Sequence, residues 1–330
     1  MTRIALDAMG GDHAPIETVA GAVDASARGI DVVLVGDREA IEGELGKHEA
    51  NLPIVDASEV IGMGDDPARA LRDKPHASIP VAAKLVASGD AHGFVSAGST
   101  GAAMAAAVII LGRVAGASRP AIATIFPTPG SPTLVLDSGA NPDVRPELLA
   151  QFAVMGAVAA EVLLGADPAR VGLLSIGEER GKGRDLEREA YELIEQTPVT
   201  FVGNVEGRDV ATDKVDVIVT DGFTGNVFLK ATEGTASLIN RYVLEALSEL
   251  RADVQAEILP ALLKVREKMD WETYGGGQLL GVRGAALIAH GSSSRRAITN
   301  ALQMAHDSAD KDLPGRVSAA LERAAQTALT

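Results

Sequence analysis

Short apolar segments rich in valine, isoleucine and leucine alternate with segments of helical periodicity along most of this sequence. The segments Ile4–Leu6, Val32–Val35 and Leu134–Leu136 contain only apolar residues. Strands with both faces buried have this composition, because neither face meets water. Their alternation with helices predicts an α/β fold built on a mostly parallel sheet that helices cover on both faces.

The same pattern assigns the other elements. Further strands are expected at Gly93–Ser96, Val171–Ser175, Val199–Val202 and Val215–Thr220. Helices are expected at Ile16–Ser26, Glu39–Gly46 and Thr100–Leu111. No low-complexity linker divides the chain, so we interpret residues 1–330 as a single catalytic α/β domain.

Composition excludes several classes of protein. The chain has no cysteine, which excludes disulfides, thiolate metal sites and a cysteine nucleophile. The net charge of −15 argues against general nucleic-acid binding, which needs a basic face. The first residues, MTRIALDAMGG, lack the features of a signal peptide, and the apolar run Ala102–Leu111 is too short to span a bilayer. A cytoplasmic protein is therefore expected.

One long region has an almost wholly helical pattern. It runs from about Asn226 to Met269 and is broken near Leu250–Asp253. Apolar residues recur at helical spacing on both arms, which predicts a helical hairpin within residues 226–272. Such a hairpin could form a dimer interface or contact a membrane through its apolar segment 257–263, and the sequence leaves both readings open.

Polar, glycine-rich loops follow nearly every expected strand. In parallel α/β sheets, ligands bind at the carboxyl ends of the strands, so these loops are expected to meet at one rim of the sheet. The loops are DAMGGDHAP (7–15), SAGSTGA (96–102), DSGANPDVRP (137–146), SIGEERGKGRD (175–185), GNVEGRD (203–209) and TDGFTGNV (220–227).

The first of these loops could hold an anion. Gly10 and Gly11 allow the backbone to approach a ligand closely, and a helix N-terminus follows. The alternative is a tight strand–helix turn capped by Asp12. A metal site is disfavoured, because Asp7, Asp12 and His13 are adjacent and lack a distant partner at ligand spacing.

The loop at 96–102 follows the same logic. Ser99 or Thr100 can cap the alanine-rich helix that follows, and Gly98 and Gly101 allow close approach. The spacing is not that of the dinucleotide fingerprint G-x-G-x-x-G. An anion site and a well-capped core helix both fit this segment.

Three later loops carry candidate catalytic side chains. The loop at 175–185 does not match the phosphate-binding P-loop, but it places Lys182 between glycines, where a lysine suits a phosphate or an oxyanion. Asp221 and Asn226 stand between a strand and a helix, and His290 precedes three serines. The alternatives are a solvated lysine, a capped turn and a structural histidine.

Together the motifs resemble the PlsX family of bacterial phosphate acyltransferases. Seven segments occur in the family's order between Asp7 and about Asn300. The chain has Ser99 where the family often has asparagine, and Gly277-Gln278 where it often has Ala-Pro. The segments are DAMGGDHAP, SAGSTGA, SIGEERGKG, NVEGRDV, VTDGFTGNVFLK, YGGGQLLGVRG and AHGSSSRRAI.

The resemblance implies a reaction and a fold. The expected reaction transfers a fatty acyl group from acyl carrier protein to inorganic phosphate, giving acyl phosphate for phospholipid synthesis. The expected fold is a three-layer α/β/α architecture similar to phosphotransacetylases and isopropylmalate dehydrogenases. A homodimer is expected, in contact with the inner face of the cell membrane and with a downstream glycerol-3-phosphate acyltransferase. Neither a cofactor nor a metal is expected.

Residue roles follow as hypotheses. Lys182 and Asn226 are expected to contact the phosphate and the developing oxyanion, and Asp221 and His290 to orient groups or transfer a proton. The residues expected to bind phosphate or the acyl group are Asp7, Gly10, Gly11, His13, Gly98, Ser99, Thr100, Gly101, Thr224, Gly225, Ser292 and Ser293.

Docking of an acidic carrier protein on this acidic chain requires local positive charge. The candidate docking residues are Lys264, Arg266, Lys268, Arg295 and Arg296, and the alternative is a solvated helix face. Two other functions stay open: a phosphotransacetylase-like enzyme that uses acyl-CoA, and a non-catalytic phosphate- or nucleotide-binding regulator. A dehydrogenase is disfavoured, because no dinucleotide fingerprint follows the first strand.

Overall fold

The computed structural model describes residues 2–269 and 271–327. Within them, eleven strands form one sheet in the order β3-β2-β1-β4-β11-β10-β5-β6-β9-β7-β8. The strands are β1 (Arg3–Asp7), β2 (Asp31–Gly36), β3 (Ile54–Asp56), β4 (Gly93–Ser96), β5 (Ala121–Phe126), β6 (Thr133–Leu136), β7 (Arg170–Leu174), β8 (Thr200–Val205), β9 (Val217–Val219), β10 (Gly277–Leu280) and β11 (Ala285–Ile288).

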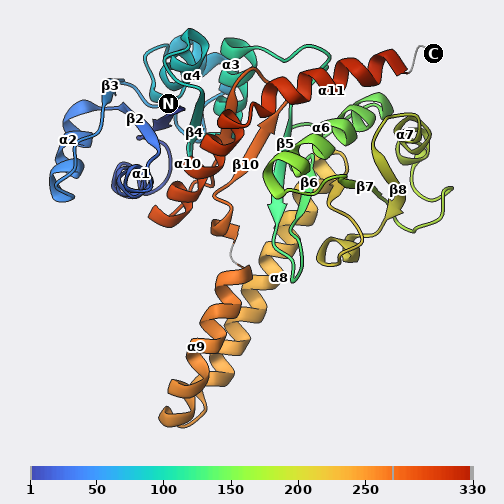
Figure 1. Cartoon of the computed structure of the whole chain (residues 1–330). Coiled ribbons are helices and arrows are strands. Elements are labelled where there is room, and N and C mark those ends of the chain that lie inside the picture. The colour runs from blue at the N-terminus through green and yellow to red at the C-terminus, as the bar shows by residue number, and fades with distance from the viewer. Residues whose placement is uncertain (1, 270, 328–330) are drawn as a thin grey trace.

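Helices lie on both faces of this sheet (Figure 1). They are α1 (Ile16–Ala27), α2 (Arg38–Lys47), α3 (Pro67–Asp73), α4 (Ser78–Ser88), α5 (Thr100–Ala106), α6 (Pro146–Leu164), α7 (Asp185–Glu195), α8 (Gly222–Ser248), α9 (Ala252–Met269), α10 (Arg295–Asp310) and α11 (Leu313–Thr327). Shorter turns are the π-helical η1 (Ala107–Leu111) and the 3-10 turns η2 (Gly207–Ala211) and η3 (Trp271–Thr273). The predicted three-layer α/β/α fold is confirmed.

The apolar strands divide their side chains between two cores. In β1, Ile4 and Leu6 join the larger core, which also contains side chains of α1, α6, α10 and α11. Ala5 points to the opposite face and joins the second core, beneath α4, α5 and η1. Alternate residues of a strand face opposite sides, so a continuous apolar run fills both cores.

The expectation that all the loops share one rim is wrong. Strands β3, β2, β1, β4 and β11 are mutually parallel. So are β6, β9, β7 and β8. Between these two sets, β11–β10, β10–β5 and β5–β6 are all antiparallel pairs. Three reversals make the two parallel sets run in opposite directions, so their carboxyl ends lie at opposite edges of the sheet.

Short central strands still let loops from both edges approach one another. Strands β10 and β6 have four residues each, which at 3.3 Å per residue is about 13 Å. A ligand-sized cleft can therefore touch the loops after β4 and β11 from one edge and the loops after β6 and β9 from the other. The site depends on this geometry.

Helix α6 is long and apolar enough to cross a membrane by length and composition alone. Two thirds of its apolar window is buried inside the protein, and Phe152 and Met155 are fully buried in the larger core. It is the main core helix of the second half of the sheet.

Helices α8 and α9 form an antiparallel pair that projects from the body (Figure 1). The chain reverses between Ser248 and Ala252, near the predicted break. Large apolar side chains are exposed along this hairpin. They include Leu238, Ile239, Tyr242, Leu244, Ile258, Leu259, Leu263 and Val265.

Candidate active site

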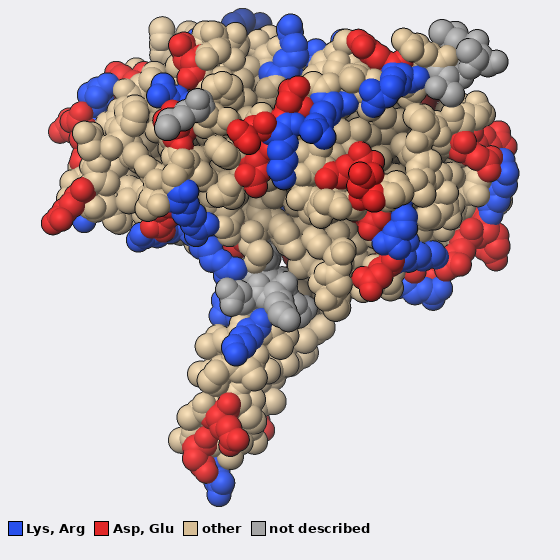
Figure 2. Space-filling view, in the orientation of Figure 1, with Lys and Arg blue, Asp and Glu red and all other residues tan. Residues whose placement is uncertain are grey.

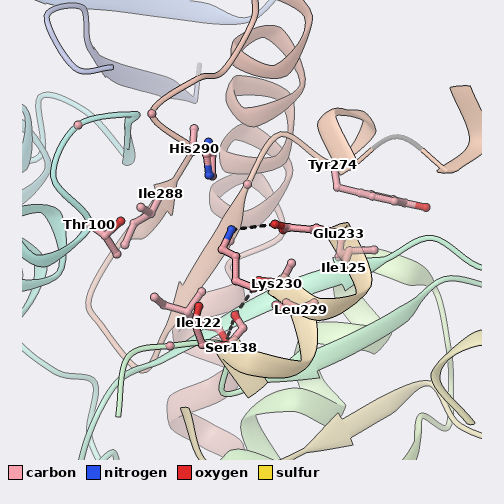
Figure 3. A pocket seen from close by; sticks show the side chains of 18 of the residues that line it. Thr100, Ile122, Ile125, Ser138, Leu229, Lys230, Glu233, Tyr274, Ile288 and His290 are labelled. Carbon is pink, nitrogen blue, oxygen red and sulfur yellow. Dashed lines mark hydrogen bonds and ion pairs between the residues drawn. The ribbon is translucent and has the colours of Figure 1, made fainter. Parts of the chain in front are cut away.

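A cleft of about 500 Å³ lies between the two halves of the sheet. Its first wall comes from the loops after β1, β4 and β11, and its second wall from the loop after β6 and the first turns of α8. Figure 3 shows the side chains that converge on it. The first wall includes Asp12, Gly98, Thr100 and His290, and the second includes Ser138, Gly139, Asn226 and Lys230.

The floor of the cleft is apolar. Ile122 and Ile125 of β5, Leu229 of α8 and Ile288 of β11 line it, with Tyr274 at one side (Figure 3). Burial raises the pKa of Tyr274 above its ordinary value, so the phenol stays neutral. Such a floor with a few polar groups above it is typical of a site for a small molecule with a hydrocarbon part.

One face of α8 carries the polar groups of the second wall. Asn226, Lys230 and Glu233 lie on this face, because they are separated by four and three residues. Lys230 Nζ is 2.8 Å from Glu233 Oε2, and the two side chains point toward one another in Figure 3. Among the described residues that line the cleft, Lys230 is the one lysine or arginine.

Sequence reasoning missed Lys230, although the motif TDGFTGNVFLK contains it. The signal was its position four residues after Asn226, which places both side chains on one helix face. The position of a residue in the loop after a strand selects candidates before the helix, and Lys230 lies within the helix.

Asp221 anchors the start of α8 and does not line the cleft. Its carboxylate accepts hydrogen bonds from the Thr224 amide at 2.7 Å and the Thr224 hydroxyl at 2.8 Å, and Arg184 lies 2.6 Å away. Burial acts to raise the pKa of Asp221, but these hydrogen bonds outweigh it and lower the pKa below its ordinary value. At neutral pH Asp221 is therefore an ionised helix cap that positions Asn226.

Asp137 organises the loop that faces α8. Its fully buried carboxylate accepts hydrogen bonds from the backbone amides of Ile122 (3.0 Å), Gly139 (3.2 Å), Ala140 (3.0 Å) and Asn141 (2.7 Å). The Asn141 side chain adds a fifth at 2.9 Å. One carboxylate thus fixes the turn after β6 to the start of β5.

Helix α8 is pressed against this loop at a glycine. A Cβ atom at Gly225 would collide with the Asp137 carbonyl oxygen. The amide of Gly222 also donates to the Asn141 carbonyl at 2.8 Å. The second wall is therefore a rigid unit whose position depends on Asp137.

Asp7 ties the loops of the first wall together. Ser96 Oγ donates to Asp7 Oδ2 at 2.7 Å and accepts from the Gly98 amide at 3.1 Å. Complete burial raises the pKa of Asp7, and hydrogen bonds from Ser78, Ser96, Met9 and Gly10 offset part of this effect. A Cβ atom at Gly10 would lie 2.7 Å from the Gly98 nitrogen, so the β1 and β4 loops touch through backbone.

Three backbone amides in and just after the turn that follows β11 donate to acceptors within the protein. His290 Nδ1 is 2.8 Å from Ser292 Oγ, and the amides of Ser292 and Ser293 donate to His290. The Arg295 amide, at the start of α10, donates to the Glu17 carboxylate. These three amides already have acceptors, whereas His290 and Gly291 line the cleft.

The structure brings some of the predicted site residues together. Asn226, His290, Gly98 and Thr100 line the cleft. Gly10, Gly11 and Ser99 line a smaller cavity beside it, of about 130 Å³, together with Gly98. Ser99 also caps α5 by accepting from the Ala102 amide at 3.4 Å.

Other predicted residues lie outside both linings. They are Asp7, His13, Lys182, Gly101, Asp221, Thr224, Gly225, Ser292 and Ser293. Gly101 packs on Pro67, where a Cβ atom would lie 2.6 Å from Cγ. The Ser293 hydroxyl is buried without a hydrogen-bond partner among the described residues.

Lys182 is exposed in the loop after β7. That strand belongs to the second parallel set and is separated from β6 by β9. Its stem folds over Gly177, where a Cβ atom would lie 3.1 Å from Lys182 Cγ. The structure therefore does not place Lys182 with Asn226 and Gly98, and its role stays a prediction.

The predicted docking residues lie near the base of the hairpin. Lys264 and Arg266 are exposed on α9, Arg295 pairs with Asp24, and Arg296 donates to Thr273 at 2.9 Å. The side chain of Lys268 lies outside the described residues. Figure 2 shows basic side chains gathered where the hairpin meets the body.

Potential metal-ligating side chains are scattered over residues 2–269 and 271–327. No three histidine, aspartate or glutamate side chains there come together in a way that could hold a metal ion. The described cleft offers an ammonium, an amide, an imidazole, hydroxyls and the carboxylates of Asp12 and Glu233 above an apolar floor.

The model of a family described as fatty acid synthesis protein matches residues 2–316. The phosphate acyltransferase of Desulforamulus reducens is 47% identical over 98% of this chain and 98% of its own length. The phosphate acyltransferase of Gloeobacter violaceus is 48% identical, over 96% of this chain and 95% of its own length.

A solved structure shares the fold. The phosphotransacetylase from Streptococcus pyogenes superposes with a TM-score of 0.62 over 94% of each chain, at 17% sequence identity. At that identity the likeness bears on architecture alone. It agrees with the three-layer fold.

Proposed function

We infer that this chain, which belongs to the fatty acid synthesis protein family, transfers an acyl group to inorganic phosphate and so makes acyl phosphate for phospholipid synthesis. Its relatives named phosphate acyltransferase share nearly half of its residues over almost its whole length. The proposed chemistry is supported chiefly by the cleft, where the ammonium of Lys230 and the amide of Asn226 lie on one helix face above an apolar floor.

The proposed reaction needs no nucleophilic side chain. A phosphate oxygen attacks the carbonyl carbon of a thioester, forming a C–O bond, and the C–S bond then breaks. The proton of hydrogen phosphate ends on the departing thiolate, so acyl phosphate and a free thiol result. A thiol of ordinary pKa, about 8.5, leaves with little acid assistance. Alignment of the two reactants is the main task, and it can lower the barrier by about 7–11 kcal/mol.

We propose that Lys230 and Asn226 bind the phosphate and the developing oxyanion. Lys230 supplies the positive charge and Asn226 supplies amide N–H donors on the same helix face. This assigns to Lys230 the role that sequence reasoning had given to Lys182. His290, whose Nδ1 is oriented by Ser292, is proposed to orient the phosphate or to pass the proton to sulfur.

The donor that we propose is a fatty acyl thioester of acyl carrier protein. The apolar floor suits the acyl chain. Lys264, Arg266 and Arg296, near the base of the hairpin, supply positive charge for an acidic partner. The alternatives are a phosphotransacetylase-like enzyme that uses acyl-CoA and a non-catalytic regulator that binds phosphate or a nucleotide.

The test supplies the protein with acyl carrier protein thioester and phosphate and traps acyl phosphate as the hydroxamate. We expect turnover with this donor, and a lower kcat/KM with the CoA thioester of the same acyl chain. A higher kcat/KM for the CoA thioester would reassign the donor. Tight phosphate binding without turnover on either thioester would favour the regulator.

The hairpin is proposed to pair with a second subunit and to touch the inner face of the cell membrane, near a downstream glycerol-3-phosphate acyltransferase. Its exposed apolar side chains support this proposal. Changing Ile258 and Leu259 to serine tests the membrane contact by flotation with liposomes. We expect the variant to remain a dimer but no longer to float with liposomes. Unchanged flotation would mean that Ile258 and Leu259 do not contact the membrane and serve the dimer interface alone.

A further inference from the structure

The smaller cavity adjoins the cleft through shared wall residues. Asp12, Met63 and Gly98 line both spaces. Gly98 has no side chain and Asp12 is short and charged, so Met63 is the large apolar side chain common to the two. The width of the passage between the two cavities therefore depends chiefly on the Met63 side chain.

The smaller cavity suits hydrocarbon better than an anion. Met9, Val60 and Ile61 line it, and much of the remaining wall is glycine backbone. No lysine, arginine or histidine is among the described residues around it, so its described lining offers a phosphate no positively charged side chain. The Ser99 hydroxyl is already engaged as the cap of α5.

Met63 extends from the segment between β3 and α3 to the turn after β11. A Cβ atom built on Gly291 would lie 2.9 Å from Met63 Cε, so the methionine methyl rests on the turn after β11. The Met63 side chain is 56% exposed. An unbranched thioether with three rotatable side-chain bonds can swing aside at little cost.

The backbone that carries Met63 is held in place. Asp65 Oδ2 accepts from the Gly62 amide at 2.9 Å and from Lys74 Nζ at 2.7 Å. Lys74 Nζ also donates to the Val60 carbonyl at 3.1 Å. With the segment tied to the end of α3, the side chain of Met63 is the part free to move.

We propose that the acyl chain of the donor runs along the cleft floor past Met63 and that its end enters the smaller cavity. This rests on the proposed function. Met63 then determines the longest chain that is accepted. A small residue at position 63 joins the two cavities, and a larger one closes the passage. Each further buried methylene is worth about four-fold in affinity.

The test compares Met63→Ala and Met63→Trp across donors that differ only in chain length, from decanoyl to stearoyl. The kcat/KM ratio of stearoyl to decanoyl donor is expected to rise at least about four-fold in Met63→Ala. It is expected to fall by a similar factor in Met63→Trp. Because Met63 is exposed, neither variant should lose its fold, which a thermal melt checks.

A matched control is Ile109→Ala, which removes an exposed apolar side chain outside both cavities. Its chain-length profile should equal that of the unchanged protein. Calorimetric binding of acyl-pantetheine thioesters, without phosphate, gives a second profile that needs no turnover. Loss of turnover with intact chain-length binding would refute the proposed function alone. Identical binding profiles for Met63→Ala, Met63→Trp and the unchanged protein would refute the proposal that Met63 determines the longest acyl chain accepted.

Discussion

Replacing Lys230 by alanine is expected to lower kcat/KM for acyl phosphate formation by about 10²–10³-fold. Loss of one donor to a developing oxyanion costs roughly that factor, about 3–4 kcal/mol. The effect should be large here because, among the described residues lining the cleft, no other lysine or arginine can take over. The measurement is steady-state kinetics with phosphate varied, and we expect the KM for phosphate to rise as well.

The matched control is Lys182→Ala. Lys182 is an exposed lysine in a glycine-rich loop outside the cleft lining, so its loss should change kcat/KM by less than about ten-fold. Glu233→Gln removes the partner of Lys230 and should leave kcat/KM within the same range or raise it. If Lys182 proved essential and Lys230 dispensable, the phosphate-binding site would instead be assigned to the loop after β7.

Asp137→Ala is expected to destabilise the protein by at least about 4 kcal/mol. Four backbone amides and the Asn141 side chain would lose their acceptor in a buried site, and each unsatisfied donor costs about 1–3 kcal/mol. The wall against which α8 is packed would also loosen. Urea unfolding followed by circular dichroism measures the free energy of unfolding.

Two variants calibrate that result. Asp143→Ala removes an exposed carboxylate from the same loop and should stay within about 0.5 kcal/mol of the unchanged protein. Asp137→Asn keeps one acceptor oxygen but turns N–H groups toward the Asn141 donors, so an intermediate loss is expected. If Asp137→Ala were as mild as Asp143→Ala, the hydrogen bonds to Asp137 would not hold the wall.

Seven of the eleven described strands could be predicted from the sequence, whereas β3, β5, β10 and β11 could not. Gly93–Ser96 is observed with the predicted bounds, and Ile4–Leu6 grows by one residue at each end. Such runs are readable because burial on both faces demands apolar residues at every position. A run of apolar residues carries no information on strand direction, however, and direction is what divides the loops between two edges.

Strand β10 shows why the centre of the sheet was missed. The sequence YGGGQLLGVRG was treated as a glycine-rich motif, yet Gly277–Leu280 is a buried strand between β5 and β11. Its Gln278 is 2% exposed, with Ser308 donating to its oxygen at 2.9 Å and its nitrogen donating to Ala286 at 3.1 Å. Partners this distant in sequence cannot be inferred from local pattern.

The candidate site could be predicted in part for the same reason. Asn226 and Gly98 were identified because each follows a predicted strand, and His290 because a glycine and three serines follow it; all three line the cleft. Lys182 satisfied the same rule, but its strand β7 lies two positions from β6 in the sheet, and its exposed side chain lies outside the cleft lining. Lys230 lies inside α8, and a rule that considers only the loops after strands does not select residues within a helix.

Phosphate is proposed to bind in the cleft, on the helix face of Lys230 and Asn226. Crystals soaked with arsenate, which substitutes for phosphate, test it directly by anomalous diffraction. We expect an arsenic peak in the cleft, with arsenate oxygens about 3 Å from Lys230 Nζ and from the Asn226 amide. A peak at the Lys182 loop, with none in the cleft, would contradict it.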